Sequence, residues 1–314
     1  MSNIRYINDV EFKYNDDIIN GLKSYNKLQT GYREKDKRDF YVFEDSTLIA
    51  ACHTKQALDW CKISGIYYKD LDVLKALMND VRKYYRGNVE GIQFDTVLQQ
   101  RTVDFLKIGF TIAGELNDMP SENKNYFLVD RDLKRVEIEE DYQLKSSSEP
   151  NVAYDSVLKS EIKNYKKSLD FSTDKIDIQF VAFDKDKFIG GIYGHFQYEY
   201  LFINVLFVNK KYRGRRIASK LMHKIESEAV KQGVTNIYLT TFEFQARDFY
   251  KKRGYEVVMK IEDFPIGFKE YTLYKDMKLL RDKTVVSAKI IQKSPTTKNL
   301  EIWNIAYDII GITH

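Results

Sequence analysis

The sequence predicts an α/β protein of two domains, each with a mixed, mostly antiparallel sheet flanked by helices. Three observations lead to this prediction. The chain has 314 residues, which is long for one ordinary domain and suits two. Apolar stretches with the periodicity of strands alternate with stretches that have the periodicity of helices. The order of these elements in the N-terminal half returns in the C-terminal half, which indicates a duplicated domain.

The elements follow from apolar spacing and from glycine positions. In the N-terminal half we expect helices at residues 70–85 and 100–108, and strands at 40–44, 47–52, 60–68, 91–97 and 126–129. In the C-terminal half we expect helices at residues 154–168, 217–232 and 245–253, and strands at 176–183, 188–196, 200–208, 236–239 and 270–274. Gly233 and Gly254 follow two of these helices, where a glycine often ends a helix.

The two halves also have similar amino-acid sequences in one segment. DFLKIGFTIAGELNDMP begins at Asp104, and DFYKKRGYEVVMKIEDFP begins at Asp248. With small gaps, the matches are Gly109-Phe110 with Gly254-Tyr255, Asp118 with Asp263, Pro120 with Pro265, and Tyr126 with Tyr271. We therefore expect one domain at residues 1–140, a second at 150–277, and an extension at 278–314 that packs on the body. A homodimer contact is the alternative for the extension.

Composition excludes several classes of protein. No apolar run approaches the length of a membrane span, and the N-terminus lacks an apolar signal core, so we expect a cytoplasmic protein without a membrane contact. Cys52 and Cys61 do not form a zinc pattern, so we expect no metal. The net charge of +4 is too small to indicate a nucleic-acid partner.

The positive charge is concentrated in one loop. Lys210, Lys211, Arg213, Arg215 and Arg216 lie between a strand and a helix. A helix N-terminus offers unpaired backbone N–H groups and the positive end of the helix dipole, so phosphate binds there readily. Gly214 lets the backbone approach a ligand closely, and the arginines add charge-assisted hydrogen bonds. This combination predicts a site for a polyanion such as a diphosphate.

The same loop resembles motif A of the GNAT superfamily of N-acetyltransferases, whose pattern is Arg/Gln-x-x-Gly-x-Gly/Ala. Arg213 takes the first position and Ala218 the last, and Arg216 stands where the family usually has glycine. The resemblance implies two tandem acyl-CoA N-acyltransferase-like domains, with acetyl-CoA as cosubstrate. The residues implied to hold it are Leu206, Phe207, Val208, Arg213, Gly214, Arg215, Arg216, Ile217, Ala218 and Ser219. The strands at 200–208 and 236–239 should splay apart, so that pantetheine lies between them on backbone groups of Leu206 and Val208.

A second segment, from Ala246 to Tyr250 and then Gly254-Tyr255, resembles motif B of the same family. In the family the tyrosine of this helix reaches the thioester sulfur, so Tyr250 is our candidate for the acid that protonates the leaving thiolate. The alternative for Tyr250 is a core role, packing the helix on the sheet. Candidates for the base are His195 and Glu199, and Asn204 is a residue that holds a water.

The N-terminal half has lost both signals. The strand at 60–68 is followed by Lys69-Asp70-Leu71-Asp72, whose acidic residues would repel a diphosphate, and Leu106 stands where the second copy has Tyr250. We therefore expect a degenerate repeat that does not bind coenzyme A. The leading interpretation of the whole chain is an acetyl-CoA-dependent N-acetyltransferase acting on a primary amine, expected to be a small molecule. The alternatives are a non-catalytic acyl-CoA-binding or regulatory module and a nucleic-acid-associated protein.

Overall fold

The computed structural model describes residues 4–31, 36–117, 119, 123–137, 142–148, 152–167, 174–234 and 236–277. The predicted extension at residues 278–314 lies outside this described part, as do Asp118 and Pro120 of the sequence repeat. Among the described residues, no helix is long and apolar enough to cross a bilayer.

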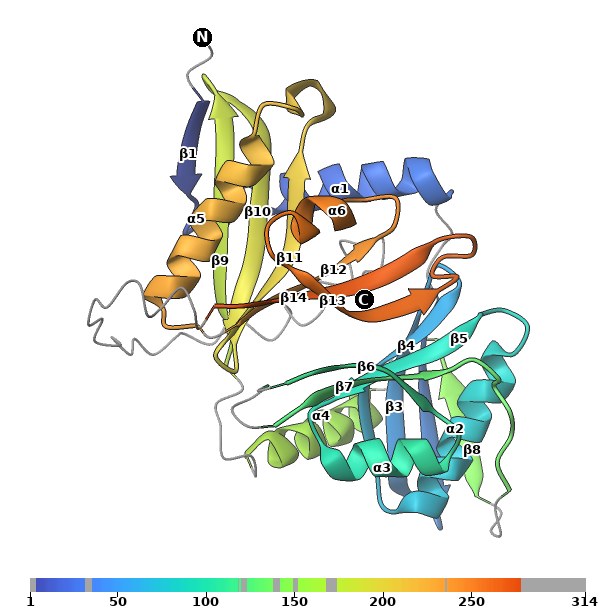
Figure 1. Ribbon diagram of the computed structural model, residues 1–314. Coiled ribbons are helices and arrows are strands. Elements are labelled where there is room, and N and C mark those ends of the chain that lie inside the picture. Colours follow the sequence, from blue (N-terminus) through green and yellow to red (C-terminus); the bar gives the residue numbers. More distant parts are fainter. Residues whose placement is uncertain are drawn as a thin grey trace. The chain divides into compact units, whose positions relative to one another are not determined.

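The first half of the chain alternates strands and helices (Figure 1). Its elements are β1 (Ile4–Asn8), α1 (Asn15–Thr30), β2 (Lys37–Glu44), β3 (Thr47–Ala57), β4 (Trp60–Tyr68), α2 (Leu71–Tyr85), β5 (Gly91–Thr96), α3 (Gln99–Lys107), β6 (Thr111–Leu116) and β7 (Asn125–Asp130).

The second half repeats that order, with one 3-10 turn added. Its elements are β8 (Gln143–Ser147), α4 (Val152–Lys167), β9 (Ile176–Asp184), β10 (Lys187–Gln197), β11 (Tyr200–Val208), η1 (Lys210–Tyr212), α5 (Ile217–Lys231), β12 (Asn236–Phe242), α6 (Arg247–Lys251), β13 (Glu256–Glu262) and β14 (Lys269–Asp276). The predicted α/β class is confirmed. The strands β1, β6, β8 and β13 and the helix α1 were not predicted from the sequence.

The chain forms two compact units that are not continuous in sequence. Unit 1 consists of the described residues of Met1–Tyr32, Thr173–Val258 and Tyr271–His314, and unit 2 consists of those of Arg33–Ser172 and Met259–Glu270. The sequence predicts a single domain at residues 1–140, whereas the structure groups β1 and α1 with the sheet of the second half. The reason is local packing, because β1 pairs with β9 and α1 packs on β10 and β11.

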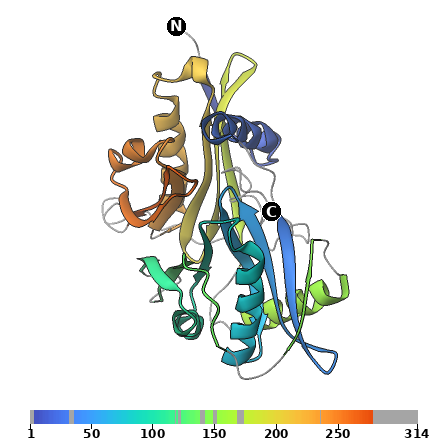
Figure 2. The same cartoon turned by 90° about the vertical axis from the view of Figure 1, so that its right-hand side faces the viewer.

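The sheet of unit 1 has the strand order β1-β9-β10-β11-β12-β14. Two helices cover its opposite faces, as Figure 2 shows for α1 and α5. The α5 face is the larger core, with Leu221, Met222 and Ile225 of the helix buried against strand residues such as Ile192. The α1 face buries Ile18 and Ile19 against Val181 and Val205 among other residues.

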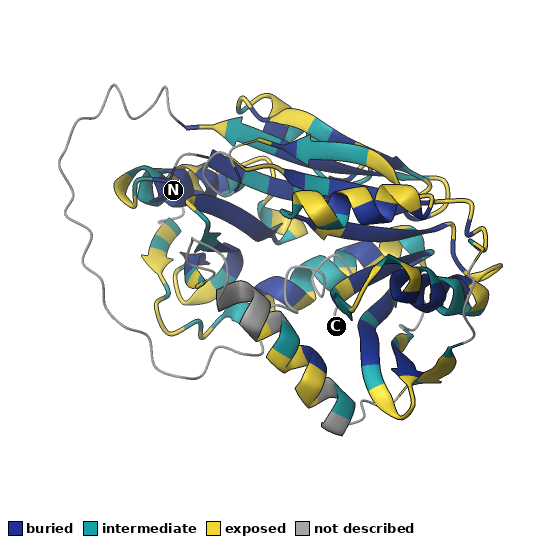
Figure 3. Ribbon diagram, turned by 90° about the horizontal axis from the view of Figure 1, so that it is seen from below, coloured by how far each residue is buried: buried dark blue, intermediate teal, exposed yellow. Residues whose placement is uncertain are grey.

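Read from the strand that the other half contributes, the sheet of unit 2 has the equivalent order β8-β2-β3-β4-β5-β7, with β6 next to β7. Its main core lies under α2, while α4 from the second half covers the other face, with Leu158 buried near Tyr41 and Phe43. Each half of the chain therefore gives its opening strand and helix to the sheet of the other half. Figure 3 shows the buried positions running along the strands, while the helices are buried on one side only.

The strand pairs whose register is described are antiparallel, with the exceptions of β4–β5 and β11–β12, which are parallel. This confirms the predicted mixed, mostly antiparallel sheets. Cys52 and Cys61 are both completely buried free thiols in unit 2. Burial raises the pKa of both thiols, so they remain protonated core residues.

Candidate functional site

A bulge and a gap mark the middle of β11 in unit 1. The register with β10 passes from Val205, opposite Tyr193, to Ile203, opposite Gly194, so Asn204 is the extra residue of a β-bulge. On its other edge β11 pairs with β12 only up to Ile203, although β11 continues to Val208 and β12 to Phe242. The predicted splay between these two strands is confirmed.

The loop after β11 leads into the start of α5 without a side-chain cap. Gly214 has φ of 78° and Arg216 has φ of 60°, both in the left-handed region. A Cβ at Gly214 would meet no atom within 4 Å, so backbone conformation rather than crowding favours glycine there. Arg216 is the N-cap residue of α5, and no side chain caps the first amides of the helix. Such a helix start keeps its N–H groups available to an anion.

The basic side chains of this loop are exposed, and two of them contact neighbouring groups of the protein. Arg213 donates from Nε to the carbonyl of Val208 at 3.1 Å, and its guanidinium lies 4.9 Å from the ring centre of Tyr25 on α1. The guanidinium of Arg215 lies 5.2 Å from the ring centre of Tyr212. These contacts orient the cations beside the helix start without neutralising their charge.

A small pocket opens at the splay, at the level of the bulge. Its volume is about 50 Å³, and it is lined by Leu22, Ile203, Asn204, Leu206, Thr240, Thr241, Gln245, Ala246 and Tyr250. These residues come from α1, β11, β12 and the start of α6. The pocket therefore joins one predicted acid candidate, Tyr250, and the predicted water-holding residue Asn204.

Tyr250 lies on α6 with only 6% of its surface exposed. Its ring contacts the rings of Phe249 and Tyr255 edge to face, at 5.2 and 5.8 Å between centres. Burial raises the pKa of the Tyr250 hydroxyl well above its ordinary value, so the phenol stays protonated at neutral pH. A protonated phenol on a pocket wall suits a proton donor.

Asn204 is bonded to His195 inside the sheet. The distance between Asn204 Oδ1 and His195 Nδ1 is 2.9 Å, so the imidazole donates its Nδ1 hydrogen to the amide oxygen. His195 is 5% exposed, and burial lowers its pKa to about 3. It is therefore neutral at physiological pH and a weak proton acceptor.

The two other sequence candidates do not meet at the pocket. Glu199 is exposed in the turn between β10 and β11, five residues before Asn204, which is about 16 Å along an extended strand. Within the described part of the chain, the pocket lining includes neither Glu199 nor His195. Sequence patterns missed Leu22, Ile203, Thr240, Thr241 and Gln245. All except Leu22 had a signal, because they lie in or directly after the strands and helix predicted at 200–208, 236–239 and 245–253.

The loop residues Arg213 to Ser219 stand as predicted at the start of α5, and Leu206 lines the pocket. Phe207 points to the opposite side of the sheet, where it packs in the α1 core. Val208, whose backbone groups were predicted to hold pantetheine, accepts at its carbonyl the hydrogen bond from Arg213 Nε.

Unit 2 has the same bulge and the same gap between strands, but it lacks the basic loop and the uncapped helix start. Ser64 is the extra residue of the bulge in β4, and β4 pairs with β5 only from Trp60 to Lys62. The side chain of Asp70 caps α2 by accepting from Val73 N at 3.0 Å. The carboxylate thus occupies the helix start that a phosphate would need, which is consistent with the acidic residues noted in the sequence.

One sequence match needs correction. The sequence predicts Leu106 as the counterpart of Tyr250, but the hydrogen bonds at the helix ends show that Phe105 is the equivalent residue. Phe110 N donates to the carbonyl of Phe105 at 3.1 Å, as Tyr255 N donates to that of Tyr250 at 3.2 Å. Phe105 is fully buried, whereas Leu106 is 40% exposed. Counting from Asp104 and Asp248 pairs Leu106 with Tyr250. Counting back from Gly109 and Gly254, which end the two helices, pairs Phe105 with Tyr250, and the structure follows the glycines.

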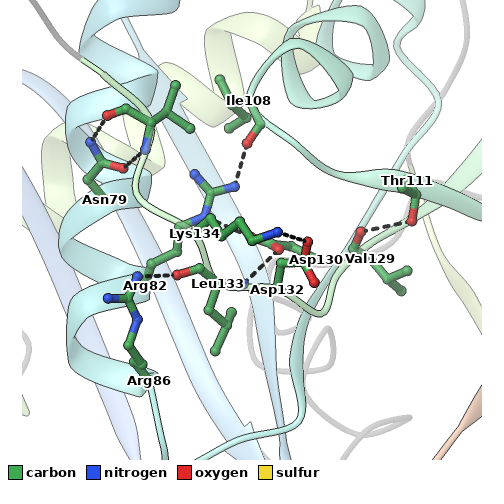
Figure 4. Close-up of polar contacts among 11 residues, drawn as sticks. Asn79, Arg82, Arg86, Ile108, Thr111, Val129, Asp130, Asp132, Leu133 and Lys134 are labelled. Atoms are coloured by element: carbon green, nitrogen blue, oxygen red, sulfur yellow. Dashed lines mark hydrogen bonds and ion pairs between the residues drawn. The ribbon is translucent and has the colours of Figure 1, made fainter.

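The end of α3 in unit 2 is held by a buried ion pair (Figure 4). Arg82 Nε lies 2.7 Å from Asp130 Oδ2, and Arg82 also donates to the carbonyl of Ile108 at 2.6 Å. Asp130 Oδ1 accepts from Leu133 N at 3.0 Å, and Arg86 donates to the Leu133 carbonyl. These contacts satisfy most of the buried polar atoms of the cluster, as a structural role requires, although Arg82 Nη1 has no hydrogen-bond partner among the described residues.

Comparisons with known proteins match part of the chain. Residues 140–255 match the acetyltransferase (GNAT) family. A blasticidin-S acetyltransferase of Streptomyces morookaense is 30% identical over 95 residues, which cover 30% of this chain and 70% of that protein. An acetyltransferase of Agrobacterium fabrum is 33% identical over 84 residues, which cover 26% of this chain and 61% of that protein. An acetyltransferase from Bacillus cereus has a solved structure that is 28% identical, with a TM-score of 0.38, covering 41% of this chain and 94% of that one.

Proposed function

The chain belongs to the GNAT family of acetyltransferases, and on that premise we propose that it transfers an acetyl group from acetyl-CoA to a primary amine of a small molecule. One observation carries this proposal. A single strand, β11, holds Asn204 at the reaction pocket and ends at the basic, uncapped start of α5. This arrangement suits a ligand with a diphosphate at one end and a reactive group at the other.

The loop supplies the anion-binding part of the site. We assign the diphosphate to the backbone amides from Arg213 to Ser219, with the guanidinium groups of Arg213, Arg215 and Arg216 as counter-charges. The splayed edge of β11 near Leu206 offers backbone groups to an extended arm of the cosubstrate. Acetyl-CoA supplies the activated acyl group when it is bound.

Tyr250 is our candidate for the general acid. A leaving thiolate has a pKa near about 8.5 and must gain a proton before it departs as a thiol. The Tyr250 phenol is protonated at neutral pH, and because burial raises its pKa and so weakens it as an acid, the transfer depends on the hydroxyl lying against the developing thiolate. Its place on the pocket wall supports this role.

We assign removal of the amine proton to water rather than to a side chain. An alkylammonium has a pKa of about 10.4 and must lose a proton before it attacks. The low pKa of His195 makes it a weak acceptor, and Glu199 lies in an exposed turn. Asn204, Thr240 and Thr241 line the pocket and can hold a water by hydrogen bonds.

The acceptor class rests on one relative. The name of the Streptomyces protein says that it acetylates blasticidin S, so we propose amines of antibiotic-like small molecules as the first candidates. A non-catalytic acyl-CoA-binding role is the second candidate, favoured by the lack of an effective proton acceptor on the described pocket wall.

Calorimetric titration with acetyl-CoA tests the first step. We expect one site per chain in the wild type and none in an Arg213→Ala/Gly214→Pro variant, because the variant removes a cation and the left-handed glycine. Thiol release with blasticidin S and a panel of amines tests the second step. Binding without thiol release from any amine would favour the binding module, and no binding in the wild type would contradict both.

A further inference from the structure

The helix α1 lies on unit 1 although it comes from the beginning of the chain. It packs on β10 and β11, and at Gly21 its backbone touches the ring of Phe207. A Cβ at Gly21 would lie 2.5 Å from Phe207 Cε1, which is shorter than any real contact of this kind. The glycine therefore allows the helix to approach β11 closely.

Hydrogen bonds fix α1 to the connection after β12 as well. Tyr25 donates from its hydroxyl to the carbonyl of Phe244 at 2.8 Å. Asn26 is 4% exposed, and its Oδ1 accepts from Gln245 Nε2 at 2.8 Å. Gln245 Oε1 accepts in turn from Phe242 N at 2.9 Å and from the Thr241 hydroxyl at 3.1 Å. The helix thus spans the gap between β11 and β12 and is held on both sides.

Leu22 follows Gly21 on this helix and lines the reaction pocket with Asn204, Leu206 and Tyr250. The pocket has a volume of about 50 Å³. On this measure a cavity needs about 10–15 Å³ to hold one water, so the pocket has room for about three to five non-hydrogen atoms. An acetyl group has three non-hydrogen atoms and a butyryl group has five, so the volume suits acetyl and is filled or exceeded by a longer acyl chain.

We propose that Leu22 sets the length of the acyl group, closing the pocket against chains longer than acetyl. This inference rests on the proposed function, because it assumes that the acyl end of the cosubstrate enters this pocket. It makes the first residues of the chain a part of the specificity of a site whose other walls lie in the second half.

Equilibrium binding of three ligands tests the role of Leu22 without an acceptor. Coenzyme A, acetyl-CoA and butyryl-CoA are titrated into the wild type and into Leu22→Ala. In the wild type we expect butyryl-CoA to bind at least about tenfold more weakly than acetyl-CoA, since a missing or surplus methylene in an apolar pocket changes affinity about 10- to 200-fold. In Leu22→Ala we expect the ratio to fall to about threefold or less, with little change for coenzyme A.

Leu28→Ala is the matched control, because Leu28 lies on the same helix and is 83% exposed. It should leave the ratio at its wild-type value. Alanine is the best helix former, so neither change should melt α1, and circular dichroism verifies this. An unchanged ratio in Leu22→Ala, or equal binding of butyryl-CoA and acetyl-CoA by the wild type, would overturn the role of Leu22 alone. Failure of coenzyme A itself to bind would overturn the proposed function and this inference together.

Discussion

The starts of α5 and α2 show how two copies of one fold diverge. Residues 209–216 join β11 to α5 in unit 1, whereas Lys69 and Asp70 alone join β4 to α2 in unit 2. The first start has two left-handed residues and no side-chain cap, and the second is closed by the carboxylate of Asp70. The uncapped start leaves its amides to water or to a bound anion, while at the capped start the carboxylate of Asp70 accepts from the amide of Val73.

The scaffold around these starts is the same in both units. Each has a bulge at the equivalent strand residue, Asn204 or Ser64, and each has a parallel pair that separates after a few residues. Backbone geometry is thus retained where the basic loop and the tyrosine are absent. If the proposed function is right, the loop and Tyr250 distinguish the active unit, whereas the splay is common to both.

The two units also differ in the charge that the main helix carries in its ion pair with the last strand. In unit 2, Arg82 of α2 pairs with Asp130 of β7. In unit 1, Glu226 of α5 pairs with Lys275 of β14 at 3.1 Å and with Arg253. Both pairs connect the main helix to the last strand of the same half. Because the polarity is reversed, the two halves cannot exchange these partners, and each helix is specific for its own strand.

The residue on the short helix, Tyr250 in unit 1 and Phe105 in unit 2, gives the largest expected effect. Tyr250→Phe makes unit 1 resemble unit 2, and we expect kcat to fall about 10²- to 10³-fold, the usual scale for a lost general acid. The affinity for acetyl-CoA should stay within about twofold, since the ring remains. Thiol release and calorimetry measure the two quantities, and the reciprocal Phe105→Tyr should gain neither binding nor activity. A Tyr250→Phe enzyme with full kcat would leave Tyr250 with only a packing role.

The helix starts give the next effect. Arg216→Asp places a carboxylate where unit 2 has Asp70, and we expect acetyl-CoA to bind about 10- to 100-fold more weakly. Two charges about 4 Å apart near a protein surface interact by about 1–4 kcal/mol, which covers this range. Asp70→Ala should lose about 1 kcal/mol of folding free energy with its cap but gain no acetyl-CoA binding, because its loop is too short. Calorimetry and urea unfolding check both variants. Wild-type affinity in Arg216→Asp would show that the diphosphate lies elsewhere.

The sequence predicted the parts of the site that lie in one segment. The strand, the basic loop and the start of α5 are contiguous, and Tyr250 follows a recognisable helix pattern, so their residue types carried the prediction. The wall formed by Leu22 could not be predicted. The segment of α1 contains Gly21 and many polar residues, and its register on β11 depends on the fit of Gly21 to Phe207, about 190 residues away in the chain. Whether His195 or Glu199 can act as the base depends on burial and on position along the strand, and residue type does not reveal either property.

His195 gives the smallest effect and a further contrast, since unit 2 carries Lys55 at the equivalent register position. Burial lowers the folded-state pKa of His195 to about 3, while an unfolded histidine has a pKa of about 6.5. Below about pH 6.5 His195 binds a proton in the unfolded chain but stays neutral in the folded protein. The contribution to stability is therefore complete above about pH 6.5 and is lost as the pH falls from there toward 3.

Between pH 7.5 and 5.5 this linkage removes about 1.4 kcal/mol from the free energy of unfolding, because one pH unit below the unfolded pKa corresponds to about that amount. His195→Gln keeps a hydrogen-bonding side chain beside Asn204 but cannot titrate, so its loss over the same interval should be smaller by about 1.4 kcal/mol. Urea unfolding at the two pH values measures the difference. His223→Gln is the control, because His223 is exposed on α5 and water surrounds it in both states. Equal losses in His195→Gln and the wild type would mean that His195 titrates in the folded protein as it does in the unfolded chain, and that it is available as a base after all.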